Sequence, residues 1–370
     1  MAKNVAVVLD IGSSAITALV GKKRLNNILA IYSKSNVDYS GFSEGKFFEE
    51  EKLEKIISQA LKNVKSDLKF NIKEITIGVP SEFCISKNKK ISVAFNGYTK
   101  LSTIILNKIY SKAVEELDNY TLTTVVPIYH ILDDKKKIIT IKPNLKALKL
   151  TCLVNAIYVE NNFIKNMNLR LSNLGIQKVN YVSSIYAEAL YLFNQKQIEN
   201  AILVDIGYLT TSVVIKKGKG LLQMNSFSLG GGHIMADIVE GLNLTVNQAE
   251  SLKKRIVLSL KTSPTDVYEI FDNKNCNVKK FKAELVDKIV FERLDMFVSF
   301  LKKCLNDYIE KQQFPIFLTG GGISYIKGAR EYISDKLGDY LKLIKPEQVE
   351  FNRPENSSIA GVLAYALKLF

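Results

Sequence analysis

The sequence predicts an α/β protein whose two similar lobes face each other across a cleft. A β-rich apolar run ends in Asp-Ile-Gly twice, once within residues 5–20 and once within residues 201–215, and a second β-rich run follows each time. Two glycine clusters, at 230–232 and 320–322, follow strand-like runs and precede stretches with helical spacing. Because each Asp-Ile-Gly repeat is typical of a hairpin, two copies far apart in the chain predict two related lobes.

The two repeated hairpins predict a pair of phosphate-binding turns. Gly12 and Gly207 permit backbone conformations closed to other residues, so successive N–H groups can converge on an anion. Hydroxyl groups beside them come from Ser13, Ser14, Thr210 and Thr211. We expect Asp10 and Asp205 to meet between the lobes, where they would hold Mg²⁺ through water and position a reacting water molecule. The chain has no GxxxxGK[ST] motif, and each turn precedes a strand pattern rather than a helix, unlike the commoner nucleotide loops.

The glycine clusters predict two further contacts with a nucleotide. Gly231 and Gly232 open a stretch with helical spacing, and a helix N-terminus favours an anion. The second cluster ends a buried strand and contains Gly320, Gly321 and Gly322. A glycine turn of this kind lets the backbone approach a flat ring closely, as a nucleoside requires. The alternative for either cluster is an ordinary connection between a strand and a helix.

Composition excludes several other classes of protein. The chain has 370 residues, of which 47% are hydrophobic and 24% charged, as in an average soluble globular protein, so disordered and fibrous classes are excluded. No apolar run reaches the roughly 18 residues that span a bilayer, and no signal-peptide core is present, so we expect a cytoplasmic protein. The net charge of +14 favours anionic partners. The lysine runs lie between apolar segments and are interpreted as solvated turns, and no nucleic-acid-binding module is recognisable, so no nucleic-acid partner is expected.

In this order the motifs resemble those of the superfamily that contains actin, sugar kinases and heat-shock chaperone ATPases. Within it, the chain most resembles the family of the bacterial cell-division protein FtsA. The matching segments are Asp10-Ile-Gly-Ser-Ser14, Gly41-Phe-Ser-Glu-Gly45, Val125-Val-Pro127, Asn247-Gln-Ala-Glu250-Ser-Leu-Lys253, Phe291-Glu-Arg293 and Leu318-Thr-Gly-Gly-Gly322. The resemblance covers nearly the whole chain. Each motif is loose, and their combination is specific.

The resemblance implies an actin-like fold, in which a ribonuclease-H-like unit is duplicated into two nucleotide-binding lobes and an FtsA-type subdomain is inserted. The implied domains are a first lobe at 1–80 plus 346–370, an inserted interaction subdomain at 81–172, and a second lobe at 173–345 with a helical outer part at 246–312.

The resemblance also implies a function. It implies an ATP-binding scaffold that polymerises, links the tubulin-like protein FtsZ to the division machinery, and binds other division proteins through the inserted subdomain. It assigns Glu250 and Lys253, neighbours on one helix face, to the ribose or base of ATP, and Arg293 to the FtsZ tail. Recruitment to the inner face of the membrane at the division site would follow. The alternatives are a PilM-like adaptor of pilus or secretion assembly and a small-molecule kinase on the same fold.

Three departures from the family pattern limit what the resemblance implies. Tyr208 and Leu209 stand where the family usually has two glycines, and Ala15 stands where it commonly has a lysine. The sequence stops at Phe370, whereas the family continues into a linker and an amphipathic membrane helix. We therefore expect at most weak ATPase activity and no autonomous membrane helix.

Overall fold

The first Asp-Ile-Gly repeat forms a hairpin at the centre of a five-stranded sheet, as predicted. The computed structural model describes residues 5–24, 28–65, 71–258, 262–272, 277–309, 311 and 314–369. The strands of this sheet are β1 (Val5–Ile11), β2 (Ala15–Lys23), β3 (Leu29–Asp38), β6 (Glu74–Val79) and β11 (Lys178–Ser183). Their order is β11-β6-β1-β2-β3, with β1 antiparallel to β2 and parallel to β6. The central strand β1 carries buried apolar side chains on both of its faces, because a core lies on each side of this sheet.

The second repeat forms the same arrangement in a second sheet. Its strands are β12 (Asn200–Ile206), β13 (Thr211–Lys217), β14 (Gly220–Phe227), β17 (Ile316–Thr319) and β18 (Leu341–Leu343). Their order is β14-β13-β12-β17-β18, and β12 is again antiparallel to the next strand and parallel to a later one. The two-lobe α/β architecture that the sequence predicts is therefore confirmed, and the two sheets have the same topology.

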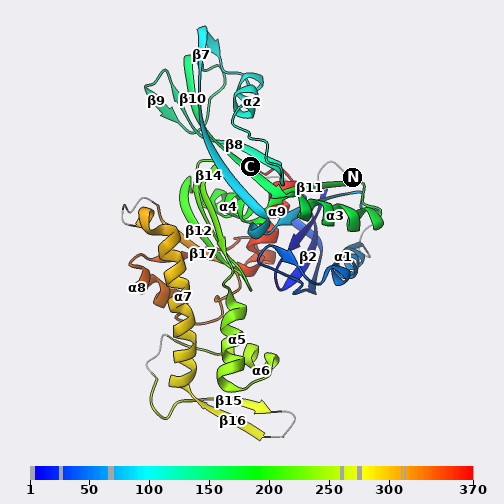
Figure 1. Cartoon of the computed structure of the whole chain (residues 1–370), viewed down its shortest axis with the longest axis vertical. Helices are drawn as coiled ribbons and strands as arrows, with labels where there is room; N and C mark the ends of the chain where they lie inside the picture. Colours follow the sequence, from blue (N-terminus) through cyan, green and yellow to red (C-terminus); the bar gives the residue numbers. More distant parts are fainter. Residues whose placement is uncertain are drawn as a thin grey trace.

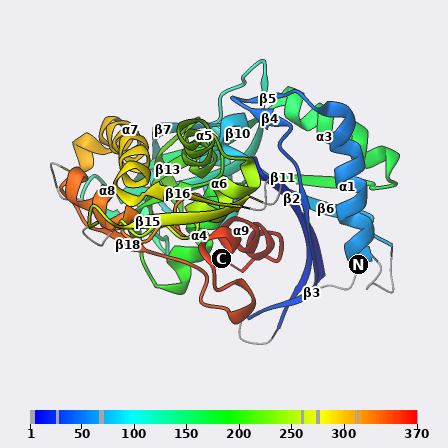
Figure 2. The ribbon, with the colours of Figure 1, turned by 90° about the horizontal axis from the view of Figure 1, so that it is seen from below.

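Two helices lie between the lobes, and others cover the first sheet. α4 (Ser184–Gln195) packs against α9 (Ser357–Ala366), and both contribute to a core shared with β1, β12 and β13. A Cβ atom on Gly361 would lie 2.5 Å from the Cα atom of Glu188, so the two helices cross with their backbones close together. Figure 2 shows this pair in the middle, with α1 (Glu50–Lys65) and α3 (Asn161–Asn173) over the first lobe. The closing helix α9 thus returns to the first lobe.

The inserted subdomain is a four-stranded antiparallel sheet covered by one short helix. Its order is β7-β10-β8-β9, and Figure 1 shows that it projects away from the two lobes. The elements are β7 (Cys84–Lys100), α2 (Thr103–Ser111), β8 (Tyr120–Leu132), β9 (Lys136–Ile138) and β10 (Lys146–Glu160). Ile109 of α2 packs with Leu150 and Cys152 of β10 in a small separate core. The other face of the sheet carries exposed β7 residues. The subdomain contacts the second lobe at Asn155, whose Oδ1 accepts a hydrogen bond of 3.2 Å from the N–H of Leu221.

The outer part of the second lobe consists of helices and one hairpin. Its elements are α5 (Gly231–Leu242), α6 (Val246–Lys253), β15 (Val267–Asp272), β16 (Asn277–Lys282), α7 (Ala283–Ile309) and α8 (Ala329–Leu337). The apolar stripe of α7, which includes Val290, Leu294 and Phe297, is fully buried against the second sheet. The remaining short elements are β4 (Phe42–Ser43), β5 (Lys46–Phe47), η2 (Ser81–Phe83), η3 (Val349–Phe351) and η4 (Pro354–Asn356).

The boundary between the two lobes lies later in the chain than the sequence predicts. β11 lies after the predicted start of the second lobe at residue 173, yet it pairs in parallel with β6 of the first sheet, from Lys178↔Glu74 to Ser183↔Val79. A parallel pairing between distant segments leaves no local mark in the sequence, because the hydrophobic pattern of a strand does not specify its neighbour. Within the described residues, no helix combines the length and apolar character needed to cross a bilayer.

Candidate functional site

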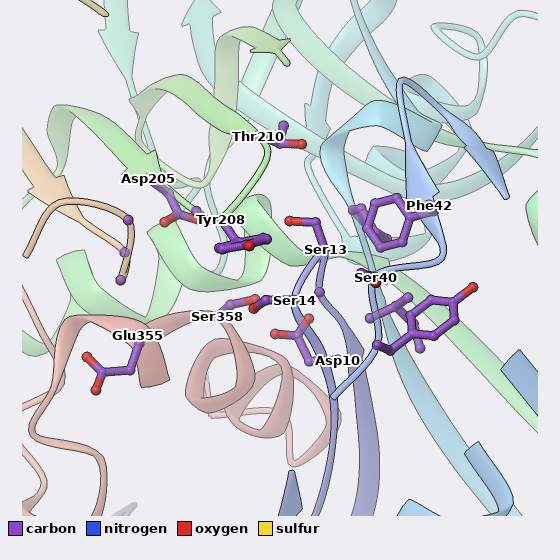
Figure 3. A pocket seen from close by; sticks show the side chains of 18 of the residues that line it. Asp10, Ser13, Ser14, Ser40, Phe42, Asp205, Tyr208, Thr210, Glu355 and Ser358 are labelled. Carbon is purple, nitrogen blue, oxygen red and sulfur yellow. The ribbon is translucent and has the colours of Figure 1, made fainter. Parts of the chain in front are cut away.

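A cleft of about 840 Å³ lies between the lobes, where the two Asp-Ile-Gly turns face each other (Figure 3). Twelve of the predicted site residues line it: Asp10, Gly12, Ser13, Ser14, Asp205, Gly207, Thr210, Glu250, Lys253, Gly320, Gly321 and Gly322. Gly231 and Gly232 lie directly behind this lining. Arg293 lies elsewhere, on α7. The fold therefore brings residues from positions 10 to 322 to one site.

The two predicted phosphate turns have the same backbone geometry. Gly12 donates its N–H to the carbonyl of Ala15 at 2.9 Å, and Gly207 donates to that of Thr210 at 2.9 Å. A Cβ atom at either glycine would lie 2.8 to 3.0 Å from the same carbonyl oxygen, so both turns are too tight for a side chain. The duplication seen in the sequence thus extends to hydrogen bonds that close each hairpin.

Backbone hydrogen bonds join the three glycine turns of the second lobe. Gly231 donates to the carbonyl of Gly207 at 2.9 Å, and Gly232 donates to that of Tyr208 at 2.7 Å. Gly322 donates to the carbonyl of Ile206 at 2.7 Å. These N–H groups are engaged within the protein, so Gly231 and Gly232 hold the second phosphate turn in place here. Gly320 has a φ of 90° and lies over the carboxylate of Asp205, where a Cβ atom would come within 2.2 Å of Oδ1.

Tyr208 and Leu209 make one backbone contact across the cleft and one side-chain contact that a glycine could not make. The N–H of Leu209 donates to Oγ of Ser13 at 3.0 Å, so the two phosphate turns are joined directly across the cleft. The ring of Tyr208 lies in the cavity between Asp205 and Ser14 (Figure 3). A Cβ atom on Gly232 would lie 2.9 Å from this ring, so the ring fills the space beside the start of α5. Part of the predicted phosphate space is therefore occupied by protein.

Three carboxyl groups gather at the base of the cleft, and the sequence reading missed one of them. Glu188 lies on α4, is 1% exposed, and faces Asp10 and Asp205. Its Oε2 atom is buried without a hydrogen-bond partner among the described residues, whereas Oδ1 of Asp10 accepts a hydrogen bond of 2.8 Å from Oγ of Ser184. The sequence signal for Glu188 was a single acidic residue inside the apolar run of residues 185–193. A core helix rarely buries a glutamate that has no partner.

Burial raises the pKa of all three carboxyl groups, and repulsion adds to the increase for Asp205 and Glu188. Burial raises the pKa of Asp205 to about 7, and the charge of Asp10 adds to this increase. Burial, followed by the charges of Asp205 and Asp10, raises the pKa of Glu188 well above its usual value. Burial also raises the pKa of Asp10, against hydrogen bonds from Ser358 and Ser184. In the described part of the chain, no three His, Cys, Asp or Glu side chains are arranged to hold a metal by themselves. A cation here would therefore take further oxygen ligands from phosphate and water.

Glu250 and Lys253 lie next to each other on α6, as their spacing predicts. Nζ of Lys253 is buried and contacts the carbonyl oxygen of Gly231 at 3.1 Å and Oε2 of Glu250 at 3.4 Å. Burial lowers the pKa of Lys253, and the charge of Glu250 opposes that change. This pair ties α6 to the start of α5 at one wall of the cleft.

Arg293 on α7 does not line the cleft, and its guanidinium group is already paired with an acidic side chain. Its Nε and Nη2 atoms donate to the two carboxylate oxygens of Asp237 on α5, each at 2.6 Å. The hydrogen bonds to Asp237 raise the pKa of Arg293. A bidentate pair of this kind is among the stronger charged contacts at a protein surface. An acidic partner would have to compete with Asp237 for this arginine.

Comparison with known proteins agrees with this geometry. The family described as "Cell division protein FtsA" matches residues 202–361. The FtsA protein of Staphylococcus epidermidis (strain ATCC 12228) is 21% identical over 388 residues, covering 99% of this chain and 80% of that protein. The FtsA protein of Enterococcus hirae is 21% identical over 374 residues, covering 98% of this chain and 83% of that protein.

Solved structures share the fold at lower identity. The "PilM-PilN type IV pilus biogenesis complex" has a TM-score of 0.66 at 16% identity and covers 98% of both chains. MreB5 of Spiroplasma citri bound to AMPPNP has a TM-score of 0.54 at 14% identity, covering 97% of this chain and 94% of that chain. The MamK double helical filament has a TM-score of 0.54 at 14% identity, with 98% of each chain covered. The chain therefore shares the fold of these actin-like structures, and its sequence is similar to FtsA proteins over nearly its whole length.

Proposed function

We propose that this chain is an ATP-binding scaffold of the cell-division machinery, which self-associates and links FtsZ to that machinery from the inner face of the membrane. The observation that carries the proposal is the pair of Asp-Ile-Gly turns on opposite walls of one cleft. Similarity to FtsA proteins across nearly the whole chain supports it. The fold shared with a solved filament supports self-association.

The residues of the cleft fit a nucleotide with Mg²⁺. Oγ1 of Thr210 is buried in the cleft beside the carboxyl group of Glu82, where a phosphate would compete with that carboxyl group for the hydroxyl. Asp10 and Asp205 would hold the cation, which Mg²⁺ commonly binds through one or two carboxylates with phosphate and water. The cation would offset the repulsion among the buried carboxylates. Ser13 and Ser14 would donate to phosphate, and the Gly320–Gly322 turn would lie against the nucleoside.

Binding of ATP should depend on Asp205 only when Mg²⁺ is present. The variant Asp205→Asn should weaken Mg-ATP binding by at least about tenfold, because it removes a charged contact of about 1.5 kcal/mol or more to the cation. Binding measured in excess EDTA should change by less than about twofold, because the free nucleotide does not need that charge. Isothermal titration calorimetry measures both. Equal losses with and without Mg²⁺ would contradict the role of Asp205, and no heat from the parent protein would contradict the proposed function.

Hydrolysis should be barely measurable in the parent protein and faster after Tyr208→Gly. Attack on the γ-phosphate depends on placing donors, cation and water, and a misplacement of about 1 Å can cost about a hundredfold in rate. The ring of Tyr208 occupies space beside the second phosphate turn, so its removal should raise phosphate release, by up to about a hundredfold. A phosphate-release assay tests this, with Tyr208→Gly/Asp205→Ala as the control that should lose the gain. Fast release by the parent protein, abolished in Asp205→Ala, would contradict the weak ATPase proposal.

Binding of an FtsZ tail at Arg293 should be limited by its ion pair with Asp237. The variant Asp237→Asn should strengthen binding of an FtsZ C-terminal tail peptide, about threefold to tenfold, because the arginine loses a competing carboxylate. Arg293→Glu should abolish it. Fluorescence anisotropy with a labelled tail peptide measures both variants. If neither variant changes the affinity, the tail does not bind at Arg293.

A second candidate is an adaptor of pilus or secretion assembly. The pairing of Arg293 with Asp237 favours this candidate, because it leaves the predicted FtsZ contact engaged within the protein. The fold shared with the PilM-PilN complex is consistent with it. Absence of any binding to the FtsZ tail would support the pilus or secretion adaptor over the division scaffold.

A further inference from the structure

Lysines are concentrated in two segments of the inserted subdomain. Residues 84–114 contain six lysines and no acidic residue, and residues 128–152 contain six lysines and two aspartates. These two segments carry a net charge of +10, and the acidic residues between and after them, Glu115, Glu116, Asp118 and Glu160, reduce the net charge of residues 84–160 to +6 of the protein's +14. The two segments form β7, α2, β9 and the adjoining parts of β8 and β10, which Figure 1 shows projecting away from the lobes. The rest of the chain carries the other +8, and the fold gathers many of the subdomain's lysines toward its outer end.

Three segments of this subdomain meet at its outer end, which we call the distal tip and define as residues 96–104, 133–137 and 142–149. Lys100 of β7 pairs with Lys146 of β10 in the strand register. The N–H of Leu101 donates to the carbonyl of Leu145 at 2.9 Å. Oδ1 of Asp133 accepts hydrogen bonds of 2.8 Å from the N–H groups of residues 148 and 149. These contacts make the tip one continuous surface.

The lysines of the distal tip are largely without acidic partners. Lys149 pairs with Asp134 at 2.8 Å, and Asp133 is engaged by backbone N–H groups. No ion pair within 4.0 Å connects the other tip lysines to an acidic side chain of the described residues: Lys100, Lys135, Lys136, Lys137, Lys142 and Lys146. All six are exposed. Nζ of Lys137 lies over the ring of Tyr129, 3.9 Å from its centroid, and the exposed lysines together would attract an extended anionic surface.

Large apolar side chains are exposed among these lysines. Tyr98 is 68% exposed, Ile104 is 74% exposed, and Leu148 is 41% exposed. They come from the end of β7, the first turn of α2 and the start of β10, so three elements of the tip each expose an apolar side chain. Exposed apolar side chains surrounded by lysines are typical of surfaces that enter the headgroup region of a bilayer.

We propose that the distal tip docks on an anionic lipid bilayer, with its lysines against the headgroups and Tyr98, Ile104 and Leu148 in the interface. This inference does not rest on nucleotide binding or on FtsZ. An acidic peptide is the competing partner, and the composition disfavours it. Residues 84–152 contain no arginine, the residue whose planar fork suits a specific carboxylate, whereas lysine acts as a point charge toward a diffuse anionic surface. The cavities of about 840 and 800 Å³ lie between the lobes and along α1, and neither includes a tip residue.

Vesicle sedimentation with the full chain tests this proposal. The vesicles contain phosphatidylcholine alone or phosphatidylcholine with roughly one-third phosphatidylglycerol, which supplies the anionic surface. The parent protein should bind only the anionic vesicles. Lys100→Glu/Lys146→Glu should bind them at least about thirtyfold more weakly, because each lysine near such a surface contributes roughly fivefold and the reversal adds repulsion.

The matched control places the same change of net charge elsewhere. Lys62→Glu/Lys65→Glu alters two exposed lysines of α1, in the first lobe, and should bind within about threefold of the parent protein, because charges beyond a Debye length of about 10 Å are screened. Both double variants should keep the thermal midpoint of the parent protein. Equal losses in the two double variants, or no loss in either, would overturn the proposal.

A second pair of measurements separates the membrane from an acidic protein. At low salt, Tyr98→Ser/Ile104→Ser should bind anionic vesicles like the parent protein. At roughly 0.5 M salt, where charge attraction is screened, the parent protein should keep some binding and this variant should lose it. If all binding disappears at that salt already in the parent protein, the apolar side chains do not enter the bilayer and that part of the proposal is wrong. Binding of a soluble poly-glutamate peptide without binding to anionic vesicles would assign the tip to an acidic protein and overturn the proposal.

Discussion

The free energy of unfolding of the nucleotide-free protein should fall by up to about 4 kcal/mol between pH 4 and pH 8, because buried carboxyl groups must ionise. The pKa of Asp205 is raised from 3.8 to about 7 in the folded protein. Between these values the folded state retains a proton that the unfolded state has lost, so stability decreases as the pH rises through this window. The raised pKa values of Glu188 and Asp10 act in the same direction.

Urea denaturation at pH 5 and pH 8 measures this effect, with isosteric variants as controls. Asp205→Asn and Glu188→Gln each remove one ionisable group at nearly constant volume. Each should reduce the difference in stability between the two pH values, and each should make the nucleotide-free protein more stable than the parent protein at pH 8. Asp205→Asn also removes a charge that raises the pKa of Glu188, which reduces the pH dependence further. Identical pH profiles in the three proteins would show that these carboxyl groups have the same pKa in the folded and unfolded states.

Mg²⁺ should restore part of the free energy of unfolding that is lost at pH 8. A cation beside Asp10 and Asp205 binds the folded protein with these groups ionised and stabilises it by mass action. The effect should be absent in Asp205→Asn.

Gly231→Ala should destabilise the second lobe by about 3 kcal/mol and weaken ATP binding, because its methyl group has no space. A Cβ atom at Gly231 would lie 2.0 Å from the carbonyl oxygen of Gly322 and 2.6 Å from its carbonyl carbon. Both neighbours are backbone atoms, held by the hydrogen bond of 2.7 Å from Gly322 to Ile206, so the contact cannot be relieved by a side-chain rotation. The start of α5 must move away from the glycine turn, which disturbs two walls of the cleft.

Gly97→Ala is the matched control, because a Cβ atom at Gly97 meets no atom within 4 Å. It should change the free energy of unfolding by less than about 0.5 kcal/mol. Chemical denaturation and ATP titration compare the two variants. A Gly231→Ala protein as stable as the Gly97→Ala protein would mean that the three glycine turns are not packed as described.

Much of the candidate site could be predicted because it depends on local patterns. The Asp10-Ile-Gly and Asp205-Ile-Gly segments form the predicted hairpins, and Gly12 and Gly207 close them with the same hydrogen bond. Glycine clusters mark tight turns wherever they occur, so Gly320 could also be expected at a close backbone approach. Tyr208 and Leu209 were recognised as unusual, but their contacts with Gly232 and Ser13 were not foreseeable.

Other parts of the site depend on which distant segments pack together. Glu188 reads as one acidic residue in a core helix, and its meaning emerges only when α4 lies beneath both Asp-Ile-Gly turns. Arg293 reads as a free basic residue on α7, and its pairing with Asp237 requires α5 to lie alongside. The sequence prediction places β11 in the second lobe, and only its pairing with β6 assigns it to the first sheet.

Local hydrophobic and glycine patterns were thus sufficient for the duplicated hairpins and their carboxylates, since a turn or a hairpin is decided by a few neighbouring residues. The distribution of charge was decided by the tertiary structure alone. Lys100, Lys135 and Lys146 occupy separate, short polar stretches and read as scattered, solvated turns. Antiparallel pairing of β7, β8 and β10 brings the ends of these strands to one place, and α2 adds its first turn there. Charges sum over distance in space, whatever their separation along the chain, so the basic distal tip exists only in the folded protein.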